Sequence, residues 1–224
     1  SDVSEKLRIG LVHAGFKEIM HMPFVSKESF EKLNTQDWAA AELQNPINEN
    51  EPFLRGSLFR SLFNAVSNNV KKGYTSIKVF EVGNVFKKEN RDFVQSLHLS
   101  GIIYYHDMLQ GWSQKKFTYD FFSLKAEISK LLQTIGIQNA EFHSARSLSP
   151  FNENALDIFL GKQKIGIIGE IDLSITEKSI KKTTFGFEIY PEKIPLSFKN
   201  PKIKKTSKFP LSTRAVSYTH LRAH

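Results

Sequence analysis

The sequence predicts an α+β fold in which a mainly antiparallel sheet is flanked by helices. The stretches expected to form strands are grouped into hairpins, whereas parallel sheets alternate strand and helix along the chain. One long expected strand, IKVFEVGNVF at residues 77–86, is apolar at most positions. This composition indicates that other elements cover both of its faces. Of the 224 residues, 40% are hydrophobic, enough to bury a sizeable core.

Three stretches carry the apolar spacing of a helix. The first covers residues 2–15, where Gly15 can end the helix. The second lies within GSLFRSLFNAVSNNVKKG at residues 56–73, where two lysines near the end suit the negative pole of the helix dipole. The third follows Asp120 and ends at Gly136. These helices are expected to flank the sheet.

The remaining elements are expected to be mostly extended. A hairpin is predicted around Gly161 and Lys162, because apolar runs rich in isoleucine flank this dipeptide. A short helix is expected at residues 173–180, directly after the hairpin. The other extended stretches are residues 16–25, 95–106 and 183–190.

Most of the positive charge lies at one end of the chain. Residues 199–224 hold seven Lys or Arg and no Asp or Glu, so of the 31 bases and 23 acids in the chain, 24 bases and 23 acids precede residue 199. The body is therefore nearly neutral. Overall basicity is weak support for an RNA-binding surface on the body.

Several site classes find no support in the sequence. The chain has no cysteine, and its histidines show no metal-ligand spacing, so no metal site is expected. No apolar run approaches the roughly 18 residues that a membrane span needs, and the first residues lack the layout of a signal peptide. A cytoplasmic protein without membrane contact is therefore expected.

Five segments, in this order, resemble the β subunit of bacterial phenylalanine–tRNA ligase. Together they cover about residues 1–198, and the resemblance implies a degenerate form of the catalytic-core fold of class II aminoacyl-tRNA synthetases. Residues 199–214 are interpreted as a basic linker and the truncated start of the family's C-terminal anticodon-binding domain. Residues 215–224 are interpreted as a non-native tail. The segments are LVHAGFKEIMHMPFV, NPINENEPFLRGSLFRSLFNAVSNNVKKG, IKVFEVGNVFKKE, YDFFSLKAEISKLL and KIGIIGEID.

The resemblance also implies partners and a function. In this family, an α subunit binds ATP and phenylalanine, and two αβ pairs form an (αβ)2 heterotetramer that charges tRNA(Phe). ATP and Mg belong to the complete enzyme, while no cofactor is expected in the present segment. The chain is thus expected to be a non-catalytic assembly domain that docks the α subunit. An autonomous class II-like ATP-dependent ligase and a free-standing RNA-binding module are the alternatives.

The resemblance places the degenerate ATP motifs at four positions. Phe86, Lys87 and Glu89 match a family motif of Phe-Arg-x-Glu, in which the arginine clamps the ATP α-phosphate. Lysine supplies a point charge without the two-pronged geometry of arginine. Gly186 lies in the stretch that matches the third motif, but no arginine occurs at residues 147–213 to meet the distal phosphates. We therefore expect no catalytic residue here. A weakened ATP site and a solvated Lys-Lys turn after the strand are the two interpretations of Lys87.

Two further sets of residues are expected at interfaces. Arg55 matches an arginine of the family pattern and is assigned either to the subunit interface or to hydrogen bonds that orient its own loop. Phe59 and Phe63 could anchor the interface, but each could equally belong to the core. Contacts to tRNA phosphates are expected from the basic segment that holds Lys199, Lys202, Lys204, Lys205 and Lys208.

Overall fold

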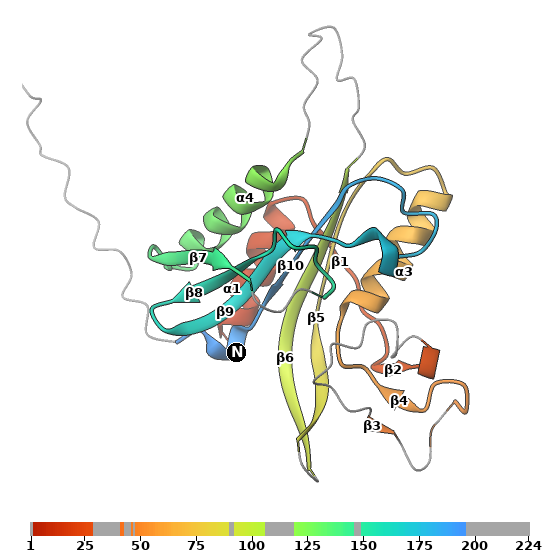
Figure 1. Cartoon of the computed structure of the whole chain (residues 1–224). Helices are drawn as coiled ribbons and strands as arrows, with labels where there is room; N and C mark the ends of the chain where they lie inside the picture. The colour runs from red at the N-terminus through yellow and green to blue at the C-terminus, as the bar shows by residue number, and fades with distance from the viewer. Residues whose placement is uncertain are drawn as a thin grey trace, which may run out of the picture.

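A seven-stranded sheet forms the centre of the fold (Figure 1), in the order β1-β5-β6-β10-β9-β8-β7. Only the pairing of β1 with β5 is parallel in this sheet, and its other neighbouring strands run antiparallel. The predicted α+β fold with a mainly antiparallel sheet is confirmed. The computed structural model describes residues 2–28, 41, 42, 46, 48–89, 92–105, 119–145 and 149–195. The strands are β1 (Lys17–Glu18), β5 (Ser76–Glu89), β6 (Asp92–Tyr105), β7 (Ala140–Ser144), β8 (Leu156–Leu160), β9 (Gln163–Glu170) and β10 (Thr184–Ile189).

Helices pack on both faces of this sheet. Helices α1 (Asp2–His13) and α4 (Phe121–Thr134) share one hydrophobic cluster with the side chains that point to one face, which we call the α1/α4 face. Helix α3 (Phe59–Lys71) packs on the opposite face, the α3 face, in a second cluster. Strand β5 contributes Phe80 to the first cluster and Val79 to the second, so it is covered on both sides as its composition predicts.

The helix ends lie close to the predicted positions. Asp120 caps α4: its carboxylate accepts hydrogen bonds from the hydroxyl of Ser123 at 2.7 Å and from the backbone N–H of Ser123 at 2.8 Å, and both bonds lower the pKa of the Asp120 carboxyl. Helix α3 ends just before Gly73, whose φ of 87° falls in the left-handed region that favours glycine.

Three features differ from the sequence prediction. The helix expected at residues 173–180 shrinks to a single 3₁₀ turn, η1 (Leu173–Ile175). Strand β7 was not predicted, because its sequence AEFHS shows only a short alternation. A small second sheet, in the order β2-β4-β3, was also missed, since its strands are two residues long and give no periodic signal. Its strands are β2 (Phe24–Val25), β3 (Ala41–Glu42) and β4 (Phe53–Leu54), and a 3₁₀ turn, η2 (Pro191–Lys193), follows β10.

Candidate functional site

A row of polar side chains crosses the α3 face of the sheet. The strand register places Glu81 opposite Ser100, Ser100 opposite Glu188, Glu188 opposite Ile167, and Ile167 opposite Asp157. Directly opposed residues of antiparallel strands point to the same face. Four of these five positions are therefore polar. Sequence reasoning missed this row, because only the register brings its members together.

Arg55 and Glu81 form the most buried ion pair of the row. Their side chains are 7% and 1% exposed, and Nη1 of Arg55 lies 2.5 Å from Oε1 of Glu81. Nε of Arg55 donates to the backbone carbonyl of Asn84 at 3.0 Å. The second carboxylate oxygen of Glu81 accepts from the hydroxyl of Ser61 at 2.8 Å and lies 3.3 Å from Nδ1 of His21. The pair thus joins β5 to α3 and to the segment before β2.

The backbone of Arg55 adds two more connections. Its N–H donates to the carbonyl of Pro23 at 2.8 Å, and its carbonyl accepts from the N–H of Phe86 at 3.0 Å. The side-chain bonds to the Asn84 carbonyl and the Glu81 carboxylate are of the kind that the loop-orienting interpretation of Arg55 expects. A role at the subunit interface stays a prediction.

A second polar cluster surrounds Glu188 at the centre of the row. Nδ1 of His98 lies 2.8 Å from Oε1 of Glu188, and the hydroxyl of Ser100 donates to Oε2 at 3.1 Å. Burial opposes ionisation of Glu188, yet His98, Ser100 and Tyr190 together hold the pKa of its carboxyl below the usual value. Burial, with the negative charges of Glu188 and Asp157, raises the pKa of the Tyr190 phenol, which stays protonated at neutral pH. The carboxylate of Glu188 thus has its partners within the chain: His98, Ser100 and Tyr190.

This network predicts a pH dependence of stability. Because the folded state lowers the pKa of Glu188, its ionised carboxylate stabilises the fold above the unfolded pKa of 4.5, and this contribution is lost as the pH falls through the lower folded pKa. Glu188→Gln should remove that part of the dependence. Urea unfolding of both forms between about pH 7 and pH 3 tests this. Parallel curves for the two proteins would contradict the assignment.

The positions matched to the second ATP motif lie in β5. Lys87 pairs with Val94 of β6, and the strand continues to Glu89. The interpretation of Lys87 and Lys88 as a turn after the strand is therefore wrong. Both lysines lie within β5, because β5 and β6 extend as one long hairpin. Gly186 pairs with Ile102 of β6, and Ile102 pairs with Val79 of β5. Val79 lies eight residues from Lys87 along β5, a span of roughly 27 Å, so the two motif positions are far apart.

Gly186 is required by close packing on the α3 face. A Cβ atom there would lie 2.7 Å from Cδ1 of Ile171 and 3.1 Å from Cε1 of Phe59. Phe151 would lie 3.3 Å away on the same side. These side chains fill the space above the strand, so the position serves the core.

Phe59 and Phe63 are buried within the chain itself. Their exposed fractions are 1% and 0%, and the Phe59 ring contacts Phe151 edge-on at 5.4 Å between centroids. The core interpretation describes where both side chains lie. A role of Phe59 and Phe63 in subunit docking stays a prediction. As buried residues, they would affect docking by setting the position of α3. The five tail lysines lie outside the described residues.

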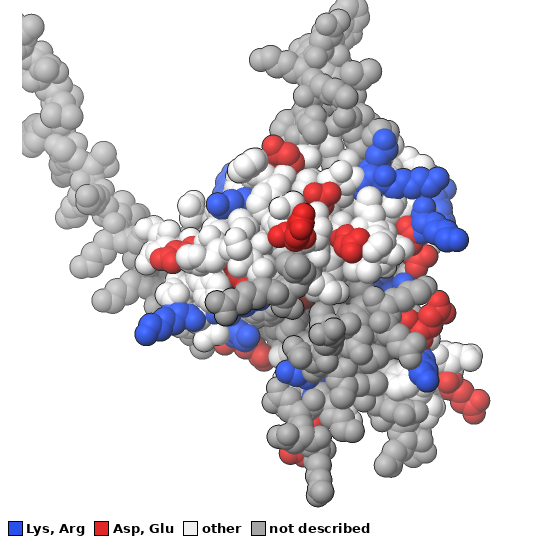
Figure 2. Space-filling model, viewed as in Figure 1, with Lys and Arg blue, Asp and Glu red and all other residues white. Residues whose placement is uncertain are grey.

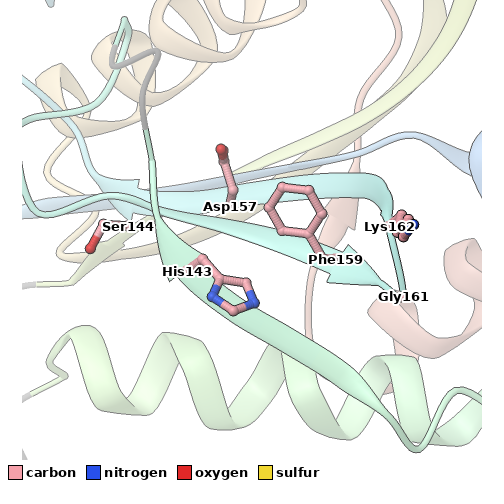
Figure 3. Close-up of a pocket in the computed structure, with 6 residues that line it drawn as sticks. All are labelled: His143, Ser144, Asp157, Phe159, Gly161 and Lys162. Carbon is pink, nitrogen blue, oxygen red and sulfur yellow. The ribbon is translucent and has the colours of Figure 1, made fainter.

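A pocket of about 520 Å³ opens where β7 forms the edge of the sheet (Figure 3). The rings of His143 and Phe159 lie beside each other there, 5.5 Å apart. Asp157 is paired with Lys164 at 2.6 Å rather than directed at an incoming group. The sequence shows no signal for a site at His143, because β7 was not predicted. The pocket is lined by His143, Ser144, Asp157, Phe159, Gly161 and Lys162.

Two kinds of feature are absent from the described residues. No group of three or more His, Asp or Glu side chains there could hold a metal ion. None of the helices in that part of the chain is long and apolar enough to cross a membrane.

Comparisons with known proteins agree on one family. The family described as "Phenylalanyl tRNA synthetase beta chain CLM domain" matches residues 1–190. The phenylalanine–tRNA ligase beta subunit of Thermotoga maritima is 27% identical over 206 residues, which are 91% of this chain and 26% of the relative. That of Wigglesworthia glossinidia brevipalpis is 29% identical over 92% of this chain and 26% of the relative. The chain thus spans about a quarter of the length of these relatives.

A solved structure shares the fold. The pyrrolysyl tRNA synthetase PylSc of Desulfitobacterium hafniense superposes with a TM-score of 0.65 at 15% sequence identity, over 86% of this chain and 64% of the other. At this identity, the likeness concerns the fold alone.

Proposed function

The chain belongs to the phenylalanyl-tRNA synthetase beta chain CLM domain family, and from this premise we propose that it is a non-catalytic assembly domain of phenylalanine–tRNA ligase. Its sheet retains the class II synthetase architecture, while the charging of tRNA(Phe) with phenylalanine takes place on an α subunit that the domain docks. The main observation in support is that buried side chains fill the space on the α3 face of the sheet. Phe59 and Phe151 occupy the space above Gly186 where a nucleotide would need room.

The polar row supports the same proposal. Catalysis of adenylate formation needs donors that are preorganised toward the developing charge. Here Arg55 is committed to Glu81 and Asn84, and His98 faces Glu188. These groups pair with one another. They therefore stabilise the sheet and are not available to bind a ligand.

The complete enzyme supplies what this domain lacks. We propose ATP and Mg as its cofactors, an (αβ)2 heterotetramer as its assembly, tRNA(Phe) as its substrate and the cytoplasm as its location. Residues 1–198 would be the assembly domain and residues 199–214 a basic linker leading into an anticodon-binding domain. Contacts of that linker with tRNA would come from its lysines at positions 199, 202, 204, 205 and 208.

Copurification tests the docking step. We expect a tagged, full-length β subunit that contains this chain to retain the α subunit of the same organism through size-exclusion chromatography. A matched variant that lacks the segment corresponding to residues 1–198 should lose it. Retention of the α subunit by that deletion variant would show that docking lies elsewhere.

The autonomous-ligase alternative makes the opposite prediction for nucleotide binding. Isothermal calorimetry of the chain with ATP and Mg²⁺ should give no heat of binding, because the described face has no open phosphate site. As a positive control, the assembled enzyme should bind ATP in the same buffer. Saturable binding of ATP by the isolated chain would favour an independent ligase.

A further inference from the structure

Five lysines gather beside the C-terminal end of α3. We call them the α3 basic patch. The lysines of the patch are all exposed. Figure 2 shows lysine and arginine side chains concentrated on the right of the upper part of the molecule, over the end of α3 and the loop beside it, whereas acidic side chains lie nearer the middle of the view. The patch consists of Lys71, Lys72, Lys178, Lys181 and Lys182.

The fold brings the two halves of this patch together from distant parts of the sequence. The hydroxyl of Ser67 lies 2.7 Å from that of Ser179, which fixes the loop between η1 and β10 against α3. Lys71 lies one turn beyond Ser67 on the same side of the helix, and Lys178 is adjacent to Ser179. Ile180 is 3% exposed and anchors the loop in the core cluster of α3.

The patch makes the charge of the body strongly uneven. The two segments that carry the patch are residues 59–74 and 174–184, and their one acidic residue is Glu177. Its carboxylate lies 3.1 Å from the guanidinium of Arg60. Six bases and one acid give these two segments a net charge of +5. Since residues 1–198 carry 24 bases and 23 acids, the rest of the body is left with −4. The near-neutral total therefore conceals a basic surface on one side.

We propose that the α3 basic patch binds the phosphate backbone of tRNA, an inference that rests on the proposed function. Exposed lysines on two rigidly joined segments can neutralise several phosphates of one RNA strand. Tyr74 follows Lys72 after a single glycine, and its ring is 57% exposed. An exposed aromatic ring beside lysines can stack on a base, which favours RNA over an acidic protein as the partner.

The salt dependence of tRNA binding tests this inference in the assembled αβ enzyme. A patch variant with Lys71→Gln, Lys181→Gln and Lys182→Gln is compared with a control variant with Lys17→Gln, Lys130→Gln and Lys162→Gln, which removes three exposed lysines from other elements. The affinity for tRNA(Phe) is measured by fluorescence anisotropy between 50 and 300 mM KCl. With about 0.7 to 0.9 units per phosphate contact, the patch variant should show a slope shallower by about two units. The control slope should match the parent.

Each outcome has a distinct meaning. Equal slopes for the patch and control variants would overturn the inference while leaving the proposed function intact, provided that the parent enzyme binds tRNA and retains the α subunit. A patch variant that loses the α subunit but keeps the parent's affinity for tRNA would assign the surface to protein contact and likewise overturn it. Failure of the parent to bind either partner would overturn the proposed function as well.

Discussion

Replacing Arg55 with alanine is expected to destabilise the chain by about 3–5 kcal/mol, because it leaves the Glu81 carboxylate buried without its main partner. Glu81 is 1% exposed, so water cannot take over the role of the guanidinium. Its remaining partners are the hydroxyl of Ser61 at 2.8 Å and the backbone N–H and ring Nδ1 of His21, each at 3.3 Å, and these do not replace the guanidinium. The measurement is urea denaturation of the variant and the parent at pH 7.

A double variant separates the buried charge from the loss of packing. Arg55→Met with Glu81→Leu removes both charges and keeps similar volume, so it should recover a large part of the stability lost in Arg55→Ala. A loss below about 0.5 kcal/mol in Arg55→Ala would place the side chain among surface residues and contradict the burial described here.

Phe59→Ala should cost about 3–5 kcal/mol of folding free energy with no partner present, as the truncation of a core phenylalanine does. The ring is 1% exposed and lies between Phe63, Phe151 and the position of Gly186. Its removal opens a cavity between α3 and the sheet. Thermal and urea unfolding of the chain without the α subunit measure this cost.

Phe122→Ala is the matched control, because this phenylalanine is 76% exposed on α4. Its truncation should change the unfolding free energy by no more than about 0.5 kcal/mol. If Phe59→Ala left the stability of the isolated chain unchanged and weakened only α-subunit binding, Phe59 would be an interface anchor and the core assignment would be wrong.

The main elements could be predicted from the sequence because their signals are local. Helix α3 combines a wide apolar stripe with a glycine stop, and Asp120 and Gly136 lie at the two ends of α4. The two-residue strands β2, β3 and β4 carry no such signal and depend on tertiary contacts. The backbone bonds of Arg55 with Pro23 and Phe86 are examples of these contacts.

The polar row could not be predicted from the sequence. Glu81, Ser100 and Glu188 are far apart in the chain, and only the strand register makes them neighbours. The α3 basic patch was missed for a related reason. A net charge taken over the whole body averages Lys71 and Lys181 with acids on other surfaces, and it carries no information about where the charges lie.

Phenylalanine-dependent exchange of pyrophosphate into ATP tests the central claim most directly. The purified β subunit that contains this chain should give no exchange above background, and addition of the α subunit should restore it. Exchange by the β subunit alone would contradict the account, since it would require a working adenylate site on a sheet face that Phe59 and Phe151 fill.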